Sequence, residues 1–282
     1  MKLNSLLIFI VSVFGFFNAS CKRYLETKSA VVKSYSKTML VKDISTAAVG
    51  NIQMTINSGI DYLPCRTTNQ VVQHQYYAFS YNEEYEQADW VAYELKTNYI
   101  KNNNFKRPYF IKDAQVKTGS ADWRNYKNTS YDKGHLCPAG DMEFDLKSYN
   151  DTFLTSNISP QVRKFNSGVW NRLEQKVRYW AVKYDGLYVV TGGVLEPTLK
   201  TIGTEKVAVP KMFYKILLCK SGNSWKMIGF LIPNEQSEAP LYQFVVSVDA
   251  IEKATGIDFF CKLNDTVESK LEKGSDYKSW SF

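Results

Sequence analysis

The sequence has few of the side chains from which metal centres are most often built. Its 282 residues include only two histidines, His74 and His135, which excludes a site with several histidine ligands. Five cysteines are present, but none stand in a Cys-x-x-Cys spacing, which argues against a structural zinc site. Internal repeats and low-complexity tracts are also absent from Tyr62 onward. Any histidine chemistry must therefore use one or both of the two histidines.

Long apolar runs are lacking beyond the N-terminus. Residues 1–20 contain a basic start, a short apolar run over Leu6–Phe17 and a small polar exit, which is the layout of a secretory signal peptide. Cys21 follows directly and resembles a bacterial lipoprotein cleavage site, although Asn18 stands where such sites usually carry an aliphatic residue. Two alternatives remain, lipid attachment at Cys21 or plain signal cleavage. We expect an exported protein without a transmembrane helix in its mature form: an outer-membrane lipoprotein, or a periplasmic or extracellular protein.

The composition favours a folded protein with a polyanionic partner. Apolar residues make up 44% of the chain and aromatic residues 15%, enough for a sizeable core. The formal net charge is +7, and Lys and Arg that neutralise phosphates gain affinity by releasing counterions. The alternative is that the charge serves solubility alone.

The chain divides into a signal peptide, a tether and one domain. Residues 21–60 are rich in Lys, Ser and Thr and are interpreted as a tether or N-terminal extension with at most one added strand, whereas residues 61–282 form the domain. The domain carries four further cysteines, which allow three pairings that the sequence does not distinguish. They are Cys65, Cys137, Cys219 and Cys261.

Apolar periodicity predicts the elements of this domain. A strand is expected over His74–Tyr81, followed by a helix that Asn82 would cap and that carries apolar residues at helical spacing over 85–99. Residues 102–129 resemble a loop with one short apolar run over 109–111. A second helix follows Asn166. The remaining predicted elements are strands at Leu187–Val194, Met212–Cys219, Trp225–Ile232 and Gln243–Val248, and a helix at Asp249–Thr255 that stops at Gly256.

These elements predict an α+β fold with an antiparallel-rich sheet flanked by helices, in which helices interrupt the first half and strands dominate the second. His74 stands among tyrosines in a strand pattern, where a structural role is favoured. His135 lies in the segment Tyr131–Asp141, bracketed by Gly134 and Pro138, and so belongs to a turn or strand end. A histidine there can present a ring nitrogen to solvent, and its usual pKa near 6.5 suits a general base.

The segment Asp132-Lys133-Gly134-His135 resembles the Asp-Arg-Gly-His signature of the DNA/RNA non-specific endonucleases. The similarity continues through Phe153–Gln161 and then through Phe165, Asn166, Trp170, Leu173, Glu174 and Arg178. The general resemblance runs from about residue 62 to residue 265. Lys133 replaces the arginine of the signature, which keeps the positive charge but loses the planar bidentate fork.

The resemblance implies a ββα-metal finger set into the sheet, and a role for each matching residue. His135 resembles the general base of the family, and Asn166 its direct protein ligand to Mg²⁺, for which Mn²⁺ can substitute. Glu174 resembles the carboxylate that orients water on the metal, and Asn157 a polar residue that supports the site. Arg107 and Arg178 resemble the arginines that face the phosphate, and Lys133 occupies a substrate-binding position.

Helical geometry is consistent with these roles. Asn166, Trp170, Glu174 and Arg178 are spaced four residues apart, so they form one slowly drifting row along the predicted helix. Simpler alternatives remain: Glu174 and Arg178 as an ordinary surface ion pair, and Asn166 as a helix cap.

The implied function is an exported Mg²⁺-dependent endonuclease that hydrolyses DNA and RNA with little sequence or sugar specificity and leaves 5′-phosphates. The alternative is a surface nucleic-acid-binding lipoprotein with a degenerate nuclease fold.

Overall fold

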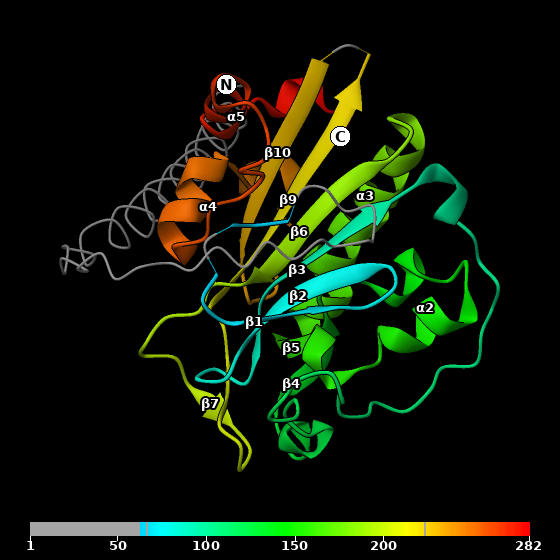
Figure 1. Ribbon diagram of the computed structural model, residues 1–282, viewed down its shortest axis with the longest axis vertical. Coiled ribbons are helices and arrows are strands. Elements are labelled where there is room, and N and C mark those ends of the chain that lie inside the picture. Colours follow the sequence, from blue (N-terminus) through cyan, green and yellow to red (C-terminus); the bar gives the residue numbers. More distant parts are fainter. Residues whose placement is uncertain (1–62, 66, 223) are drawn as a thin grey trace, which may run out of the picture. The chain divides into compact units, whose positions relative to one another are not determined.

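A seven-stranded antiparallel sheet is the main element of the computed structural model, which describes residues 63–65, 67–222 and 224–282 (Figure 1). Its strand order is β1-β2-β3-β6-β9-β10-β11, and each neighbouring pair is antiparallel. The strands are β1 (Gln70–Gln73), β2 (Tyr77–Asn82), β3 (Gln87–Leu95), β6 (Leu187–Gly193), β9 (Met212–Ser221), β10 (Ser224–Pro233) and β11 (Val245–Val246). The expected α+β class with an antiparallel sheet is confirmed.

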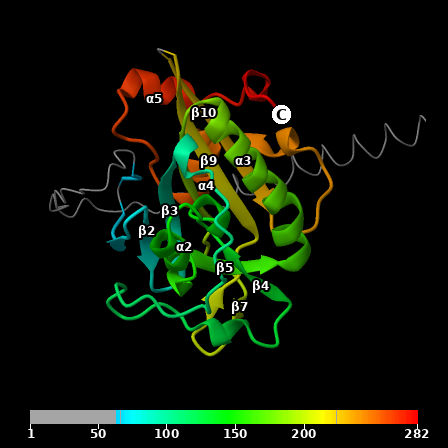
Figure 2. The same ribbon diagram turned by 90° about the vertical axis from the view of Figure 1, so that its right-hand side faces the viewer.

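Helices cover both faces of this sheet (Figures 1 and 2). Helix α3 (Asn171–Lys183) packs on one face, whereas α4 (Val248–Thr255) and α5 (Asp265–Glu272) lie on the other. Strand β3 contributes side chains to the cores on both faces of the sheet. Val91 and Tyr93 belong to the core beneath α3, whereas the residues next to them in the strand belong to the core on the side of α4. Side chains alternate between the faces of a strand, so one strand supplies two cores.

A smaller antiparallel pair stands beside the main sheet on the side of α3. It consists of β4 (Tyr131–His135) and β5 (Ile158–Val162). The chain then enters a π-helical segment, Phe165–Trp170, which continues directly into α3. This order of two strands and a helix is the expected ββα finger.

Short elements complete the chain. The hairpin β7 (Thr201–Ile202) and β8 (Val207–Ala208) lies at the end of the molecule near β4, and α2 (Leu146–Asp151) lies between β4 and β5 in the chain. Single 3-10 turns occur at Thr97–Tyr99, Trp123–Tyr126, Ala139–Asp141, Thr155–Asn157, Leu241–Phe244 and Tyr277–Ser279. None of the helices in the described ranges is long and apolar enough to cross a membrane.

The predicted helix over 85–99 is wrong, because most of this stretch forms strand β3. The pairing with β2 shifts register between Ser80 and Tyr81, which places one extra residue in β3. Ala88 and Val91 therefore face the same core although they are three residues apart, as they would be on a helix. Asn82 ends β2 and caps no helix; its side-chain oxygen accepts a hydrogen bond from the Glu84 amide at 3.0 Å.

Two further predictions need correction. The run His74–Tyr81 is not one strand, since the chain turns between β1 and β2 and the His74 amide donates to the Tyr77 carbonyl at 2.9 Å. In Gln243–Val248 only Val245–Val246 pairs as a strand. Because residues 87–95 form a strand and not a helix, the first half of the domain contains more strand than expected.

Other predictions are confirmed. Strands β6, β9 and β10 match the predicted strands within two residues, and α4 ends at Gly256, whose φ of 72° suits glycine. The predicted loop over 102–129 holds one 3-10 turn and an isolated bridge from Ile111 to Leu154. The helix after Asn166 is also present, and its apolar stripe is buried.

The structure selects one cysteine pairing among those left open. Cys65 and Cys261 form a disulfide that joins positions 196 residues apart, with their Cα atoms 6.2 Å apart. Cys137 and Cys219 are buried free thiols, and burial raises the pKa of Cys219 to about 11. The predictions for residues 1–20, for Cys21 and for the whole tether over 21–60 concern positions outside the described residues.

Candidate active site

His135 is the last residue of β4, at the strand end that the sequence predicted. Gly134 precedes it and pairs with Ser159 on β5. A Cβ atom at position 134 would collide with the side chain of Gln161, which lies over this glycine. The glycine of the motif therefore makes room for a buried β5 side chain next to His135.

Two phenylalanines hold the His135 ring. Phe153 stands edge-on to it with ring centroids 4.9 Å apart, and Phe110 is tilted against it at 5.4 Å. The Nε2 atom is buried and has no hydrogen-bond partner among the described residues, so this nitrogen does not face open solvent as the sequence suggested. Burial, aided by the charge of Arg107, lowers the pKa of His135 to about 3. The ring is therefore neutral at physiological pH and has a free nitrogen for proton transfer.

Arg107 projects from the long loop that precedes β4. Its guanidinium carbon lies 5.2 Å from the ring centroid of Phe153 and 5.8 Å from that of Phe110, the same two rings that hold His135. Lys133 contacts the same cluster, with its Nζ 5.4 Å from the Phe110 centroid. Two cations thus flank the candidate general base.

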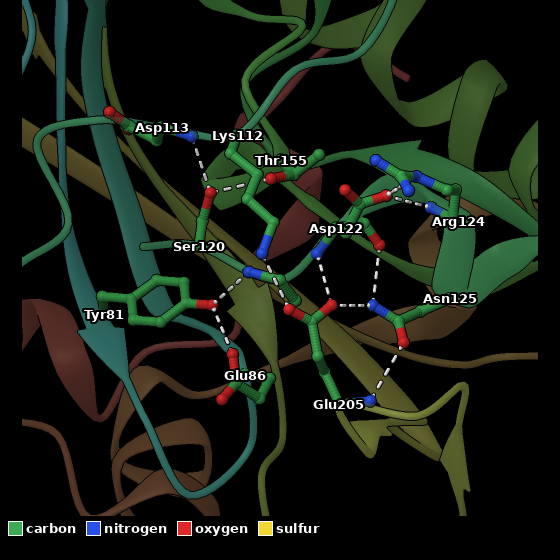
Figure 3. Close-up of polar contacts among 11 residues, drawn as sticks. Tyr81, Glu86, Lys112, Asp113, Ser120, Asp122, Arg124, Asn125, Thr155 and Glu205 are labelled. Atoms are coloured by element: carbon green, nitrogen blue, oxygen red, sulfur yellow. Dashed lines mark hydrogen bonds and ion pairs between the residues drawn. The ribbon is translucent and has the colours of Figure 1, made fainter. Parts of the chain in front are cut away.

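Polar contacts fix the loop that carries Arg107 (Figure 3). The carboxylate of Glu205, in the turn between β7 and β8, accepts a hydrogen bond from the Asp122 amide at 2.7 Å and from the Asn125 side chain. It also pairs with Lys112 at 2.8 Å. The β7–β8 hairpin consequently holds the loop at several points.

The same loop is tied to the main sheet and to the turn before β5. Ser120 Oγ accepts the Asp113 amide proton at 2.7 Å and lies 2.7 Å from Thr155 Oγ1 (Figure 3). The Ala121 amide donates to Tyr81 Oη at 3.0 Å. These bonds give the part of the loop between Asp113 and Ala121, which has no regular secondary structure, a defined path.

Asn166 lies in the π-helical segment, not in the regular helix that the sequence predicted. The Asn171 amide donates to the Asn166 carbonyl, and Gly168 has non-helical torsions of φ −104° and ψ −109°. One π turn therefore stacks Asn171 on Asn166. Asn166 is not the cap of this segment, since Lys164 occupies that position, and the cap alternative is wrong.

The amide of Asn166 is oriented by the motif itself. Its Nδ2 donates to Asp132 Oδ2 at 3.2 Å, and the other oxygen of Asp132 accepts from Arg163 at 3.2 Å. No residue in the described ranges donates to Asn166 Oδ1. This oxygen remains available to a ligand.

Glu174 lies on the first turn of α3 and lines the same cavity. Burial raises its pKa to about 7; the charge of Lys215 opposes this increase, and the charge of Asp141 adds to it. Its carboxyl group therefore changes protonation near neutral pH, which is unusual for glutamate and common in active sites.

Arg178 pairs with a buried aspartate and not with Glu174. Its Nη1 donates to Asp141 Oδ1 at 2.7 Å, and Asp141 is fully buried. Tyr93 on β3 donates to the other oxygen of Asp141 at 2.8 Å. The alternative of a Glu174–Arg178 surface pair is thus wrong, and Arg178 is held at a fixed point of the site.

These side chains surround one cavity of about 320 Å³. Six of the seven site residues that the sequence predicted within the described domain line it. The lining comprises Arg107, Lys133, His135, Pro138, Ala139, Gly140, Tyr149, Phe153, Asn166, Asn171, Glu174 and Arg178.

Asn157 is the predicted site residue that does not line the cavity. It is fully buried, and its side chain donates to the carbonyls of Cys137 and Thr152 and accepts from the Cys137 amide, each at 2.9 Å. The Leu136 amide also donates to the Asn157 carbonyl at 2.9 Å. Asn157 therefore holds the backbone that follows His135 and does not touch the space for substrate.

His74 has the structural role expected of it. Its Nε2 lies 2.8 Å from Asp113 Oδ2, and both side chains are buried. Ser156 donates to the same carboxylate oxygen at 2.6 Å. This pair joins the β1–β2 turn to the loop of Arg107, away from the cavity lining.

Three residues of this region escaped the sequence analysis. Asn171 could have been found, because it precedes Glu174 by three residues and Arg178 by seven on one helical face. Asp141 ends the quoted motif, but nothing in the sequence pairs it with Arg178. Lys215 lies within an apolar strand pattern and is fully buried, with its Nζ 4.8 Å from the Trp170 ring centroid and without a hydrogen-bond partner among the described residues.

The site fits a hard divalent cation. Asn166 Oδ1 and the carboxylate of Glu174 line the same cavity and are oxygen donors of the kind that Mg²⁺ prefers. Mg²⁺ keeps several waters, so one or two protein oxygens suffice to hold it. The raised pKa of Glu174 marks a carboxylate that a nearby cation would stabilise in its charged form.

Comparisons with known proteins agree with this geometry. Nuclease C1 of Cunninghamella echinulata var. echinulata is 32% identical over 215 residues, which cover 70% of this chain and 85% of that protein. Human mitochondrial endonuclease G is 29% identical over 205 residues, covering 67% and 69%. The crystal structure of an EndoG/EndoGI complex aligns with a TM-score of 0.67 at 29% identity, covering 71% of this chain and 89% of that one. Residues 58–266 match the DNA/RNA non-specific endonuclease family, and the chain belongs to that family.

Proposed function

We propose that this endonuclease is exported, requires Mg²⁺ and cleaves DNA and RNA alike, leaving 5′-phosphate and 3′-hydroxyl ends. The observation that carries the proposal is the shared cavity, which is lined by a neutral histidine, by oxygen donors suited to a cation and by arginines suited to a phosphate. The members of this set are His135, Asn166, Glu174, Arg107 and Arg178.

His135 acts as the general base. Its buried Nε2 takes a proton from a water molecule aligned with the scissile phosphorus, a transfer that contributes roughly 100- to 10,000-fold to the rate. The charge of Arg107 disfavours the protonated ring in the free protein. A bound phosphate offsets that charge, so substrate binding raises the pKa of His135 when a base is needed.

Asn166 and Glu174 would hold the cation and orient the water near it. Asn166 supplies Oδ1 as the direct ligand, because Asp132 already occupies its Nδ2. Glu174 accepts hydrogen bonds from water in the cavity and so orients it. Mg²⁺, when bound, would supply positive charge that stabilises the charge developing in the transition state.

Arg107 and Arg178 offset the charge on the non-bridging phosphate oxygens. They reach the cavity from different sides, one from the long loop and the other from α3, where Asp141 holds it. Lys133 adds a third positive charge but cannot form the bidentate contact of an arginine. Contacts of this kind add affinity for any nucleic acid and carry no sequence information.

Export rests on the first 21 residues alone. Their signal-peptide layout and Cys21 support secretion, with lipid attachment at Cys21 as the form of membrane association that the sequence favours.

The test is a plasmid-nicking assay with and without a chelator, run beside matched DNA and RNA oligonucleotides with end-group analysis. We expect nicking that the chelator abolishes, cleavage of both nucleic acids, and rates that decrease as salt increases. Binding without cleavage would support the alternative of a nucleic-acid-binding lipoprotein. Cleavage confined to RNA with 2′,3′-cyclic phosphate ends would refute the external-water mechanism.

A further inference from the structure

Helices α4 and α5 lie on the other face of the main sheet (Figure 1), and they carry a second group of ionisable side chains. Asp249 and Glu252 are three residues apart on α4, and Glu268 and Glu272 are four apart on α5, so each pair projects from one face of its helix. The two helices contact one another. Oxygen atoms of Asp249, Glu252 and Glu272 all lie within 4.8 Å of one another.

Glu272 is the key member of this acidic cluster. Its residue is only 7% exposed, and its Oε1 atom is buried without a hydrogen-bond partner in the described part of the chain. The Oε1 atom of Glu268 is buried and unpartnered in the same way. Burial of a carboxylate oxygen without a partner is strongly unfavourable, so an unpaired oxygen inside a carboxylate cluster points to a ligand.

Within the described ranges, no Lys or Arg forms an ion pair with this cluster. None of the ion pairs between described residues includes Asp249, Glu252, Glu268 or Glu272. One oxygen of Glu252 accepts a hydrogen bond from the Phe259 amide at 2.9 Å, which fixes the carboxylate, and the Glu252 side chain also makes a hydrogen-bond contact with that of Glu272. Asp249 is exposed, so the cluster is open to solvent on one side.

We propose that Asp249, Glu252 and Glu272 bind a calcium ion that bridges α4 and α5. The donors are all carboxylate oxygens, without histidine or cysteine, which selects a hard cation and disfavours zinc. Calcium accepts six to eight oxygens in flexible geometry, whereas Mg²⁺ demands a near-ideal octahedron. Carboxylates from two separate helices suit the larger ion, and water completes its coordination on the side of Asp249.

The ion has a structural role in this proposal. Glu252 would hold both the cation and the Phe259 amide, two residues before the disulfide cysteine Cys261. Calcium would therefore fasten α4, α5 and the segment between them as one unit. It lies on the opposite face of the sheet from the nuclease cavity, so the proposal does not depend on the function proposed above.

The competing explanation is a proton shared between Glu252 and Glu272. Burial and the neighbouring carboxyls raise the pKa of Glu272 to about 8, so in the absence of a cation this group is protonated at neutral pH. A shared proton predicts no calcium binding, and it predicts that Glu272→Gln leaves the unfolding temperature independent of calcium, as in the unchanged chain.

The experiment measures calcium binding by titration calorimetry and the unfolding temperature in calcium or in EGTA. The full chain is used with Asn166→Ala, which weakens the nuclease site. We expect one ion to be lost per chain on adding Glu252→Gln or Glu272→Gln. Without these changes, calcium at about 100 times its Kd should raise Tm by roughly 5–10 °C.

Controls separate the cluster from general effects of charge. Glu235→Gln and Glu238→Gln remove exposed carboxylates elsewhere and should leave calcium binding unchanged. If Glu272→Gln fails to fold, Asp249→Asn at the exposed edge replaces it. Equal calcium stoichiometry and equal Tm shifts in the cluster and control variants would overturn the proposal, and so would the absence of any calcium-dependent Tm shift.

Discussion

His135 is oriented by an aromatic ring, with the Phe153 centroid 4.9 Å away and the two rings nearly perpendicular at 84°. Many catalytic histidines are instead oriented by a carboxylate, which favours the charged ring. In the described domain, the histidine–carboxylate pair belongs to His74 and Asp113. The two histidines therefore differ in their surroundings. His74 is paired with a carboxylate and has a structural role, whereas His135 is neutral, lies among aromatic rings and lines the substrate cavity.

Replacing the candidate base should stop catalysis without unfolding the protein. We expect His135→Ala to lower kcat by roughly 100- to 10,000-fold, because proton transfer from water is lost. DNA affinity should remain close to that of the unchanged chain, since the arginines and Lys133 stay in place. Single-turnover cleavage and fluorescence-anisotropy binding measure the two effects. A variant with near-normal turnover would remove His135 from the mechanism.

The pKa of His135 makes a separate prediction about acid stability. The pKa of this ring is lowered in the folded state to about 3, so the unfolded chain takes up the proton more readily. The associated stability is fully present above pH 6.5 and is lost as pH decreases from 6.5 toward 3. Between pH 7.5 and 5, His135 should account for up to about 2 kcal/mol of lost stability.

Urea unfolding at both pH values checks this loss against His135→Gln, which should lose less stability than the unchanged chain. Imidazole NMR provides a direct control, because the His135 signal should not titrate between pH 5 and 8 in the free protein. A midpoint near 6.5 would show that the ring is solvated.

Asn166→Ala should raise the Mg²⁺ concentration needed for half-maximal activity, since the proposed direct ligand is lost. His135→Ala should leave the metal requirement of its residual activity unchanged. The matched control is Asn102→Ala, an exposed asparagine in the long loop. Identical Mg²⁺ titration curves for Asn166→Ala and Asn102→Ala would exclude Asn166 as the ligand.

Lys215 is expected to influence the pKa of Glu174 from its buried position on β9. Its charge opposes the increase in the pKa of Glu174, so Lys215→Met should raise that pKa above about 7. The ascending limb of the kcat–pH profile should move to higher pH, with activity recovered in alkaline buffer. Stability should decrease, because the charges of Asp141 and Glu174 lose a buried cation that offsets them.

Lys220→Met, on the exposed end of the same strand, is the control for Lys215→Met. It should not move the pH profile. A loss of activity in Lys215→Met that persists at every pH would indicate a packing defect in place of an electrostatic effect.

Membrane association is tested at Cys21. If this residue carries the lipid, Cys21→Ala should move the nuclease from the membrane to the soluble fraction. The anchor would then consist of acyl chains, each buried CH₂ contributing about 0.8 kcal/mol. Fractionation of cells that express either chain measures this. If the protein with Cys21 intact is already in the soluble fraction, the lipid anchor is excluded.

The sequence predicted the site better than it predicted the strands around it. Asn166, Glu174 and Arg178 are spaced four residues apart or a multiple of it, so helical geometry could group them, whereas His135 was joined to them only by the family resemblance of its motif. Strand β3 was misassigned because its bulge gives a strand the spacing of a helix. The partnership of Asp141 with Arg178 and the buried position of Lys215 arise only when α3 settles on the sheet, and no local pattern encodes them.

The disulfide between Cys65 and Cys261 changes the outcome of proteolytic cleavage of this protein. It closes nearly the whole catalytic domain into a covalent ring, with every residue of the nuclease cavity inside the ring. A single cut in an exposed loop such as 101–104 would open the ring but leave both fragments joined through sulfur. The two pieces could not diffuse apart, and the cleaved site could still reassemble from its own halves. Two cuts, or one cut and a reductant, would be needed to release a fragment.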